Sequence, residues 1–275
     1  MRKSIFIIIC ILFSQKLISQ THVVSLQELE NKLHAVLTDL RKSRDDATII
    51  KINEQFKRDF EEALNLEGAF DYPFSSLTTV GKIYSKDKLV RVISWNVQYE
   101  DLSHDYYSFV MKKDDRRDRV SVTELKRQKQ NLYAIQHDEI EAENWYGALY
   151  YDIIDVQRRN RTYYTLLGYD ANNERSSIKL IDVLSFIGSR PRLGAPIFEV
   201  NDNIAHRVIF EHSSDATMSL RYDNEREKII FDHLSPESPT MKEFRAFYVP
   251  DMSYDAYEWD GRRWLLIEDI IAVNK

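Results

Sequence analysis

Three histidines fall within a short stretch of the second half of the chain, and imidazole groups can bind metals or transfer protons. They are His206, His212 and His233, with Glu211, Asp215 and Asp232 beside them. Three histidines and a carboxylate would suit a zinc ion with one open coordination position. However, no two of these histidines stand at a compact ligand spacing. Adjacent strand residues also point to opposite faces, which separates a histidine from the acid next to it. We therefore expect no metal site and no other cofactor.

Paired carboxylates are the second candidate, because two acids across a groove can hydrolyse glycosidic bonds. The pairs that predicted strands could present are Asp152 with Asp155 and Glu268 with Asp269. The chain has 44 acidic residues, so a pair is easy to find and carries little weight. The sequence contains no Gly-x-Ser-x-Gly elbow, and its seven glycines form no phosphate-binding loop. No catalytic residue can be assigned, and a secreted hydrolase that uses paired carboxylates or a histidine-bound metal stays an alternative to a binding protein.

Aromatic residues are the most suggestive chemical feature, because such rings stack on sugars and anchor protein interfaces. The residues that we select as a candidate binding surface are Trp145, Tyr146, Tyr150 and Trp259. The competing interpretation is that these rings fill the core of a β-domain. Another tryptophan, Trp95, stands among Val92, Ile93 and Val97 and is predicted to be core.

The charge balance excludes one large class of partners. The chain has 38 basic and 44 acidic residues, a formal net charge of −6, and its basic clusters are short and lie among acids. A protein that neutralises nucleic-acid phosphates needs a basic field, so nucleic acid is not an expected partner.

The first residues resemble a cleavable export signal. Arg2 and Lys3 precede an apolar run from Ile5 to Phe13, which is too short for the roughly 20 residues of a membrane-spanning helix. We expect a signal peptide over residues 1–19, with Gln20 as the new N-terminus and no membrane-spanning segment after cleavage. Cys10 is the only cysteine, so the mature chain would have none. An exported protein without disulfides suits the periplasm or the outside of a bacterial envelope.

Two helices are expected between residues 25 and 65. Ser25 and Glu28 form a capping-box pattern, and apolar residues then recur at spacings of three and four. A second stripe runs from Ile49 to Leu64. Two amphipathic helices joined near residues 43–46 predict a helical hairpin, buried either against the rest of the protein or against a partner.

Beyond residue 77 the apolar period changes from 3.6 to 2. Short β-branched and aromatic segments alternate with polar turn clusters as far as residue 267, while residues 123–140 are ambiguous and include one possible short helix. Sequential hairpins predict a large antiparallel meander. We therefore expect an α+β, mainly β fold: a signal peptide (1–19), a helical hairpin (20–66) and an antiparallel β-domain (67–275). The meander would form a sandwich or an open barrel in preference to a propeller.

Several aromatic-rich segments resemble uncharacterised exported β-rich proteins of Bacteroidota. The segments are Phe70 to Phe74, Arg91 to Asn96, Trp145 to Ile153 and Phe231 to Pro236. The resemblance implies an envelope location and no activity. The sequence thus favours an exported, non-catalytic envelope protein that binds a glycan, a peptide or another envelope protein.

Overall fold

The computed structural model describes residues 25–114, 116–117, 119–200 and 203–271. The predicted signal peptide over residues 1–19, and with it Cys10, lies outside the described residues. Within the described part of the chain, neither helix is long and apolar enough to cross a membrane.

The helical hairpin forms as its sequence predicts. Helix α1 (Leu26–Lys42) starts at Ser25, whose hydroxyl accepts from the Glu28 amide while the Glu28 carboxylate accepts from the Ser25 amide. Helix α2 (Asp46–Leu64) starts at Asp45, whose carboxylate accepts from the Thr48 amide. Both starts follow from local sequence, because a capping side chain satisfies amides that have no partner within the helix.

The remaining chain forms three sheets, and its strand pairs are antiparallel except for β10 with β16. The first sheet has the order β1-β2-β3-β4, with bounds Gly81–Tyr84, Val90–Gln98, His104–Asp114 and Arg119–Leu125. The second has the order β5-β9-β8-β7-β6, with β12 also paired to β8. Its strands are β5 (Ile140–Glu141), β6 (Leu149–Arg158), β7 (Arg161–Asp170), β8 (Ser176–Ile187), β9 (Arg190–Leu193) and β12 (Val208–Ser213). The third has the order β11-β10-β16-β15-β14-β13. Its strands are β10 (Phe198–Val200), β11 (Asn203–Ala205), β13 (Leu220–Asp223), β14 (Lys228–Pro236), β15 (Tyr248–Trp259) and β16 (Trp264–Ile267).

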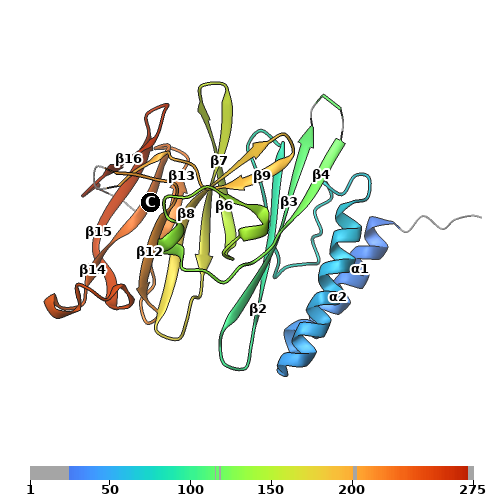
Figure 1. Cartoon of the computed structure of the whole chain (residues 1–275). Helices are drawn as coiled ribbons and strands as arrows, with labels where there is room; N and C mark the ends of the chain where they lie inside the picture. Colours follow the sequence, from blue (N-terminus) through green and yellow to red (C-terminus); the bar gives the residue numbers. More distant parts are fainter. Residues whose placement is uncertain (1–24, 115, 118, 201–202, 272–275) are drawn as a thin grey trace, which may run out of the picture.

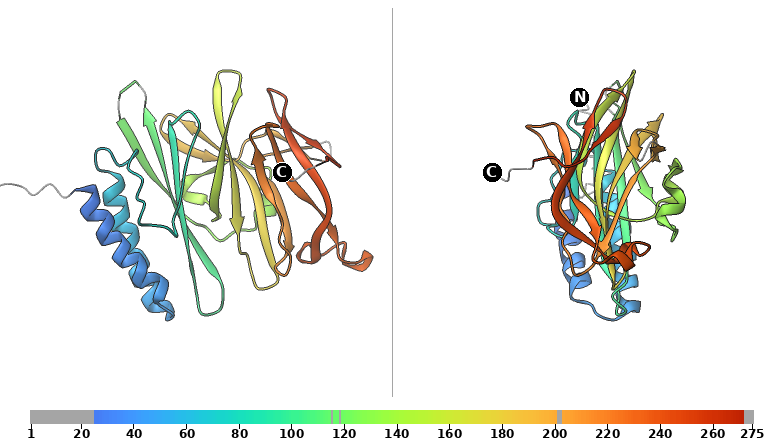
Figure 2. Two further views of the ribbon diagram at one scale, coloured as in Figure 1. Left: turned by 180° about the vertical axis from the view of Figure 1, so that it is seen from behind. Right: turned by 90° about the vertical axis from the view of Figure 1, so that its left-hand side faces the viewer.

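The helices and the three sheets stack as four layers, which Figure 1 shows from the blue helices through the green and yellow strands to the red ones. The two further views in Figure 2 show the same succession. Each junction holds its own hydrophobic cluster: helices against the first sheet, first sheet against second, and second against third. The expected fold class is confirmed, and among the described strands no sheet closes into a barrel.

Stacking on both sides explains why strand β2 is buried at almost every position. Val90 and Val92 belong to the cluster shared with the second sheet, whereas Ile93, Trp95 and Val97 belong to the cluster shared with the helices. Alternate residues point to opposite faces of a strand, so a strand with both faces covered needs apolar residues at most positions. The cluster that contains Ile93, Trp95 and Val97 also buries the apolar stripes of the helical hairpin within the protein.

Two segments differ from the sequence-based expectation. The ambiguous stretch 123–140 begins as the end of β4 and then contains a 3₁₀ turn, η1 (Leu132–Ile135), followed by β5 and η2 (Ala142–Asn144). Residues 245–249, whose aromatic and β-branched residues predict a strand, instead begin with the turn η4 (Arg245–Phe247), which follows η3 (Pro239–Met241), and β15 begins at Tyr248. Both segments are short connections whose conformation depends on the sheets that they join.

Candidate functional site

The four aromatic residues predicted as a binding surface do not lie together. Trp145, Tyr146 and Tyr150 are buried between the first and second sheets. The Trp145 Nε1 donates to the Tyr150 hydroxyl at 3.1 Å, which satisfies the indole inside the core. Trp259 is half-buried in the third sheet and packs edge-on against Trp264. Trp145, Tyr146 and Tyr150 therefore fill the core of the β-domain, which was the alternative to a binding surface.

The candidate acid pair of Asp152 and Asp155 is also separated by the fold, whereas Glu268 of the second pair lines the cavity described below. On β6, the Asp155 carboxylate accepts from the amides of Lys86 and Asp87 and so fastens the β1–β2 turn to the second sheet. Asp152 accepts from the Ile153 amide and lies near Tyr222 of the third sheet, on the opposite side. Burial raises the pKa of both carboxyls. Their roles in this arrangement are structural.

The three histidines lie on different parts of the structure. His212 is buried, with its Nδ1 2.8 Å from the Ser213 carbonyl oxygen, and burial lowers its pKa. His206 is half-buried in the connection before β12, and His233 lies in β14. Across the described residues, no group of three or more histidine, cysteine, aspartate or glutamate side chains is placed to hold a metal ion.

One of these histidines does line a cavity, which we call the cleft. It measures about 450 Å³ and lies between β12 of the second sheet and β14–β15 of the third, with η1 and η4 at its rim. Its aromatic lining is Tyr133, Phe210, Phe231, Tyr248 and Tyr257, and its charged lining is Glu211, Asp232, His233, Arg245, Asp255 and Glu268. A cavity of this size with an apolar lining and a few polar groups is typical of a ligand site.

His233 lies opposite a bulge in the neighbouring strand. Asp232 of β14 pairs with Tyr254 of β15 and Leu234 pairs with Pro250, so β15 places residues 251–253 opposite the single residue His233. Asp232 and His233 both line the cleft, although regular strand alternation would place them on opposite faces. The sequence carries no signal for this irregularity.

Carboxylates face both ring nitrogens of His233. Its Nδ1 lies 2.7 Å from Oδ2 of the buried Asp255, and its Nε2 lies 4.0 Å from Oδ2 of Asp251. The hydrogen bond to Asp255 raises the pKa of His233. Asp251 in turn accepts from the Ser235 hydroxyl at 2.7 Å. The arrangement favours the protonated form of the His233 ring and fixes its orientation.

Replacing Asp255 by asparagine should lower the pKa of His233, because the variant loses the charge that stabilises the protonated ring. In the wild type, this interaction stabilises the fold below the unfolded-state pKa of about 6.5, and the contribution is lost as the pH rises through the raised folded-state value. The measurement is an NMR titration of the imidazole signals, with the buried His212 as internal control. An unchanged His233 titration would contradict the assignment.

A second group of polar contacts lies at the rim of the cleft. The Glu211 carboxylate accepts from the Ser176 hydroxyl at 2.8 Å and from the Tyr133 hydroxyl at 3.3 Å. Burial and the nearby Glu211 charge raise the pKa of Tyr133. The exposed Arg245 of η4 places its guanidinium 5.1 Å from the centre of the Tyr133 ring. This rim therefore offers a ring face, a carboxylate and a cation to a bound molecule.

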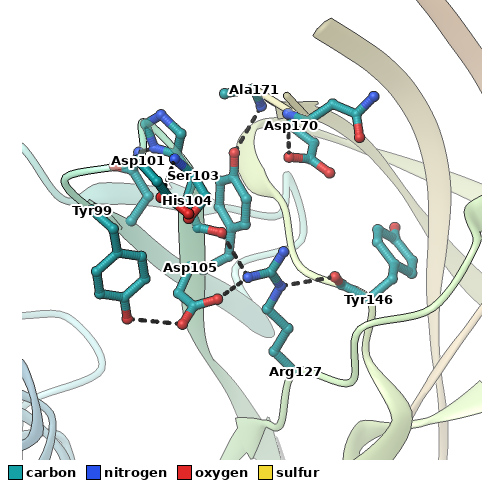
Figure 3. A network of polar contacts seen from close by, with 12 residues as sticks. Tyr99, Asp101, Ser103, His104, Asp105, Arg127, Tyr146, Asp170 and Ala171 are labelled. Carbon is teal, nitrogen blue, oxygen red and sulfur yellow. Dashed lines mark hydrogen bonds and ion pairs between the residues drawn. The ribbon is translucent and has the colours of Figure 1, made fainter. Parts of the chain in front are cut away.

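Arg127, in the connection between β4 and η1, organises the polar network in Figure 3. Its guanidinium donates to the Asp105 carboxylate, to the His104 carbonyl at 2.7 Å and to the Tyr146 carbonyl at 3.3 Å. Gly147, at φ +97°, makes room for it, because a Cβ there would lie 2.7 Å from the Arg127 Nε. The network thus fixes the start of the β4–β6 connection against the first sheet.

Sequence reasoning missed Tyr133, Arg245 and the proximity of Glu211 to both. These residues come from η1, η4 and β12, far apart along the chain, and no spacing pattern links them. Comparison of the chain with known protein families, with characterised proteins and with solved structures found no significant match. We therefore infer function from the geometry of the cleft.

Proposed function

We propose that this protein is an exported, non-catalytic binding protein and that its ligand occupies the cleft. The observation that carries the proposal is the lining itself: rings from four structural elements face fixed charges in one cavity of about 450 Å³. Rings supply contact area at a low cost in conformational entropy, and a few charged groups orient the ligand.

The surroundings of His233 favour binding over catalysis. A histidine that activates a serine needs its second nitrogen on the serine hydroxyl. Here the nearby Ser235 hydroxyl donates to Asp251 instead, and the His233 Nε2 faces that same carboxylate. The pair of His233 and Asp255 therefore supplies a polar group of fixed orientation to the cleft rather than a base for a nucleophile.

Export is supported by the N-terminal sequence, in which basic residues precede an apolar run too short to span a bilayer. The ligand would accordingly be one encountered in the periplasm or outside the cell: a glycan, a peptide or a segment of another envelope protein. The competing function, a secreted hydrolase, would use the acids of the same cleft.

A thermal-shift screen of the purified protein against amino acids, short peptides and oligosaccharides tests the proposal. A ligand present at about 100 times its Kd adds about 2.7 kcal/mol to the free energy of unfolding. We expect at least one class to raise the melting temperature. Arg245→Ala should reduce this shift, whereas Arg262→Ala, which removes an exposed arginine outside the cleft, should leave it unchanged.

The screen has three contradicting outcomes. If no class raises the melting temperature, the cleft is not a binding site for such molecules. If Arg245→Ala leaves the shift intact, the ligand binds elsewhere. If the stabilising compound is recovered as hydrolysed product, the protein is an enzyme.

A further inference from the structure

The cleft is the first of three adjoining cavities. A middle cavity of about 330 Å³ shares Tyr133 and Glu211 with the cleft. A third cavity of about 460 Å³ shares Arg127 and Lys129 with the middle one, and we call it the basic cavity. All three follow the connection that leaves β4 and runs past η1, which Figure 1 shows crossing from the first sheet toward β12. The three cavities therefore lie in succession along this connection, and we call this succession the path.

The two ends of this path carry opposite charge. The cleft has four carboxylates, on Glu211, Asp232, Asp255 and Glu268, against the three basic side chains of His137, His233 and Arg245. The basic cavity has four cations, on Lys57, Lys126, Arg127 and Lys129, against the two acids Asp105 and Glu124. An elongated ligand is thus oriented by its charges, because reversing a bipolar ligand places like charges together at both ends.

Ion pairs within the protein leave this polarity in place. Lys57 lies 3.2 Å from Glu124, and Arg127 pairs with Asp105, so the acids of the basic cavity are already neutralised. The exposed Lys126 pairs with Glu143 at 2.8 Å, so the exposed Lys129 supplies the remaining positive charge. In the cleft, Asp255 neutralises His233, whereas Glu268 is exposed to an incoming group.

The middle cavity offers amide side chains. Gln130, Asn131 and Asn172 line it, and carboxamides both donate and accept hydrogen bonds. The side-chain Oδ1 of Asn131 accepts from the backbone amide of Tyr133, and the side-chain Nε2 of Gln130 donates to the backbone carbonyl of Asn144. Both side chains are therefore held in place. Peptide groups have the same donor and acceptor pair at each residue.

We infer that the ligand is an extended peptide, with its amine end in the cleft and its acidic end in the basic cavity. This inference rests on the proposed function, because it assigns a ligand class to the same cleft. A peptide with free termini is bipolar along its length, whereas a neutral oligosaccharide has no charge at either end. The aromatic lining of the cleft then holds an apolar side chain next to the terminal amine.

Two random octapeptide pools test the inference by competition binding with a fluorescent member of the first pool. The first pool has a free amine and a lysine at its start and two glutamates with a free carboxylate at its end. The second pool is acetylated, amidated and carries glutamine at those positions. We expect the first pool to bind at least tenfold more tightly, and an excess of neutral hexasaccharides to displace none of it.

Variants at the two ends of the path locate the charges. Glu268→Gln in the cleft and Lys129→Gln in the basic cavity should each weaken binding of the first pool by about two- to fivefold, the range of a single exposed ion pair. The matched controls Glu62→Gln and Lys51→Gln remove exposed charges of the same kinds from α2, outside all three cavities. They should leave binding unchanged.

The outcomes separate this inference from the proposed function. Equal affinity for both pools, or end variants that behave like their controls, overturns the bipolar peptide. Binding of a hexasaccharide that depends on Arg245 overturns the peptide and leaves the binding cleft standing. If neither the peptide pools nor the hexasaccharides bind, both proposals fail.

Discussion

Replacing Trp95 by alanine should lower the free energy of unfolding by about 3–5 kcal/mol, the combined cost of lost burial and of the cavity left behind. The Trp95 side chain is fully buried between the helical hairpin and the first sheet. Its ring centroid lies 5.3 Å from that of Phe56 and 5.4 Å from that of Tyr107, with which it stacks.

The indole also satisfies a buried polar group. Its Nε1 donates to the Asn53 Oδ1 at 2.9 Å, and Asn53 is itself fully buried. The alanine variant leaves that oxygen without this donor, which adds a desolvation cost. Because a whole domain is stable by only about 5–15 kcal/mol, this single loss removes a large share of the total.

Urea unfolding followed by circular dichroism measures the effect. Trp259→Ala is the matched control, because Trp259 is half-buried on the third sheet, and its loss should be clearly smaller. A loss below about 1 kcal/mol for Trp95→Ala would contradict the packing of the hairpin on the first sheet, since it would place Trp95 in the range of surface substitutions.

Replacing Asp182 by alanine should cost about 3–5 kcal/mol as well, because it leaves a buried guanidinium without its counter-charge. Asp182 and Arg207 are both fully buried, with the Arg207 Nε 3.4 Å from the Asp182 Oδ1. The second carboxylate oxygen accepts from the Tyr146 hydroxyl at 2.5 Å. Arg207 also donates to the Ile135 and Leu193 carbonyls, so it joins η1 to the second sheet beside the cleft.

A comparison with an exposed pair isolates the effect of burial. Lys126 and Glu143 are 2.8 Å apart but more than half exposed, and Glu143→Ala should cost less than about 1 kcal/mol. The double variant Asp182→Leu with Arg207→Met should recover part of the loss, because it removes the unpaired charge. Equal costs for Asp182→Ala and Glu143→Ala in urea unfolding would contradict a dry, paired site.

The sequence predicted those parts of the fold that depend on local contacts. The Ser25 cap, the apolar stripes of both helices and the burial of Trp95 were predicted from neighbouring residues and are confirmed. The stacking order of the three sheets was not predicted. Where both faces of a strand are covered, its apolar pattern is the same whichever layers pack against it. The pattern therefore does not reveal the order of the layers.

The site was less accessible to sequence reasoning than the fold. Trp145, Tyr146 and Tyr150 looked like surface candidates because aromatic enrichment does not distinguish a binding face from a core. The cleft instead depends on long-range contacts among η1, β12, β14 and η4. The surroundings of His233 also depend on an irregularity in the neighbouring strand β15, which alternation rules cannot place.

Hydrogen exchange with and without a stabilising ligand tests the central claim, that ligand binding takes place in the cleft, most directly. The ligand should slow amide exchange in η1, in β12 and in the stretch of β14 around His233, where the cleft lining is concentrated. The exposed turn between α1 and α2 lies at the other end of the layer stack and should exchange at its original rate. Protection centred on the helical hairpin, with η1, β12 and β14 unchanged, would contradict the claim.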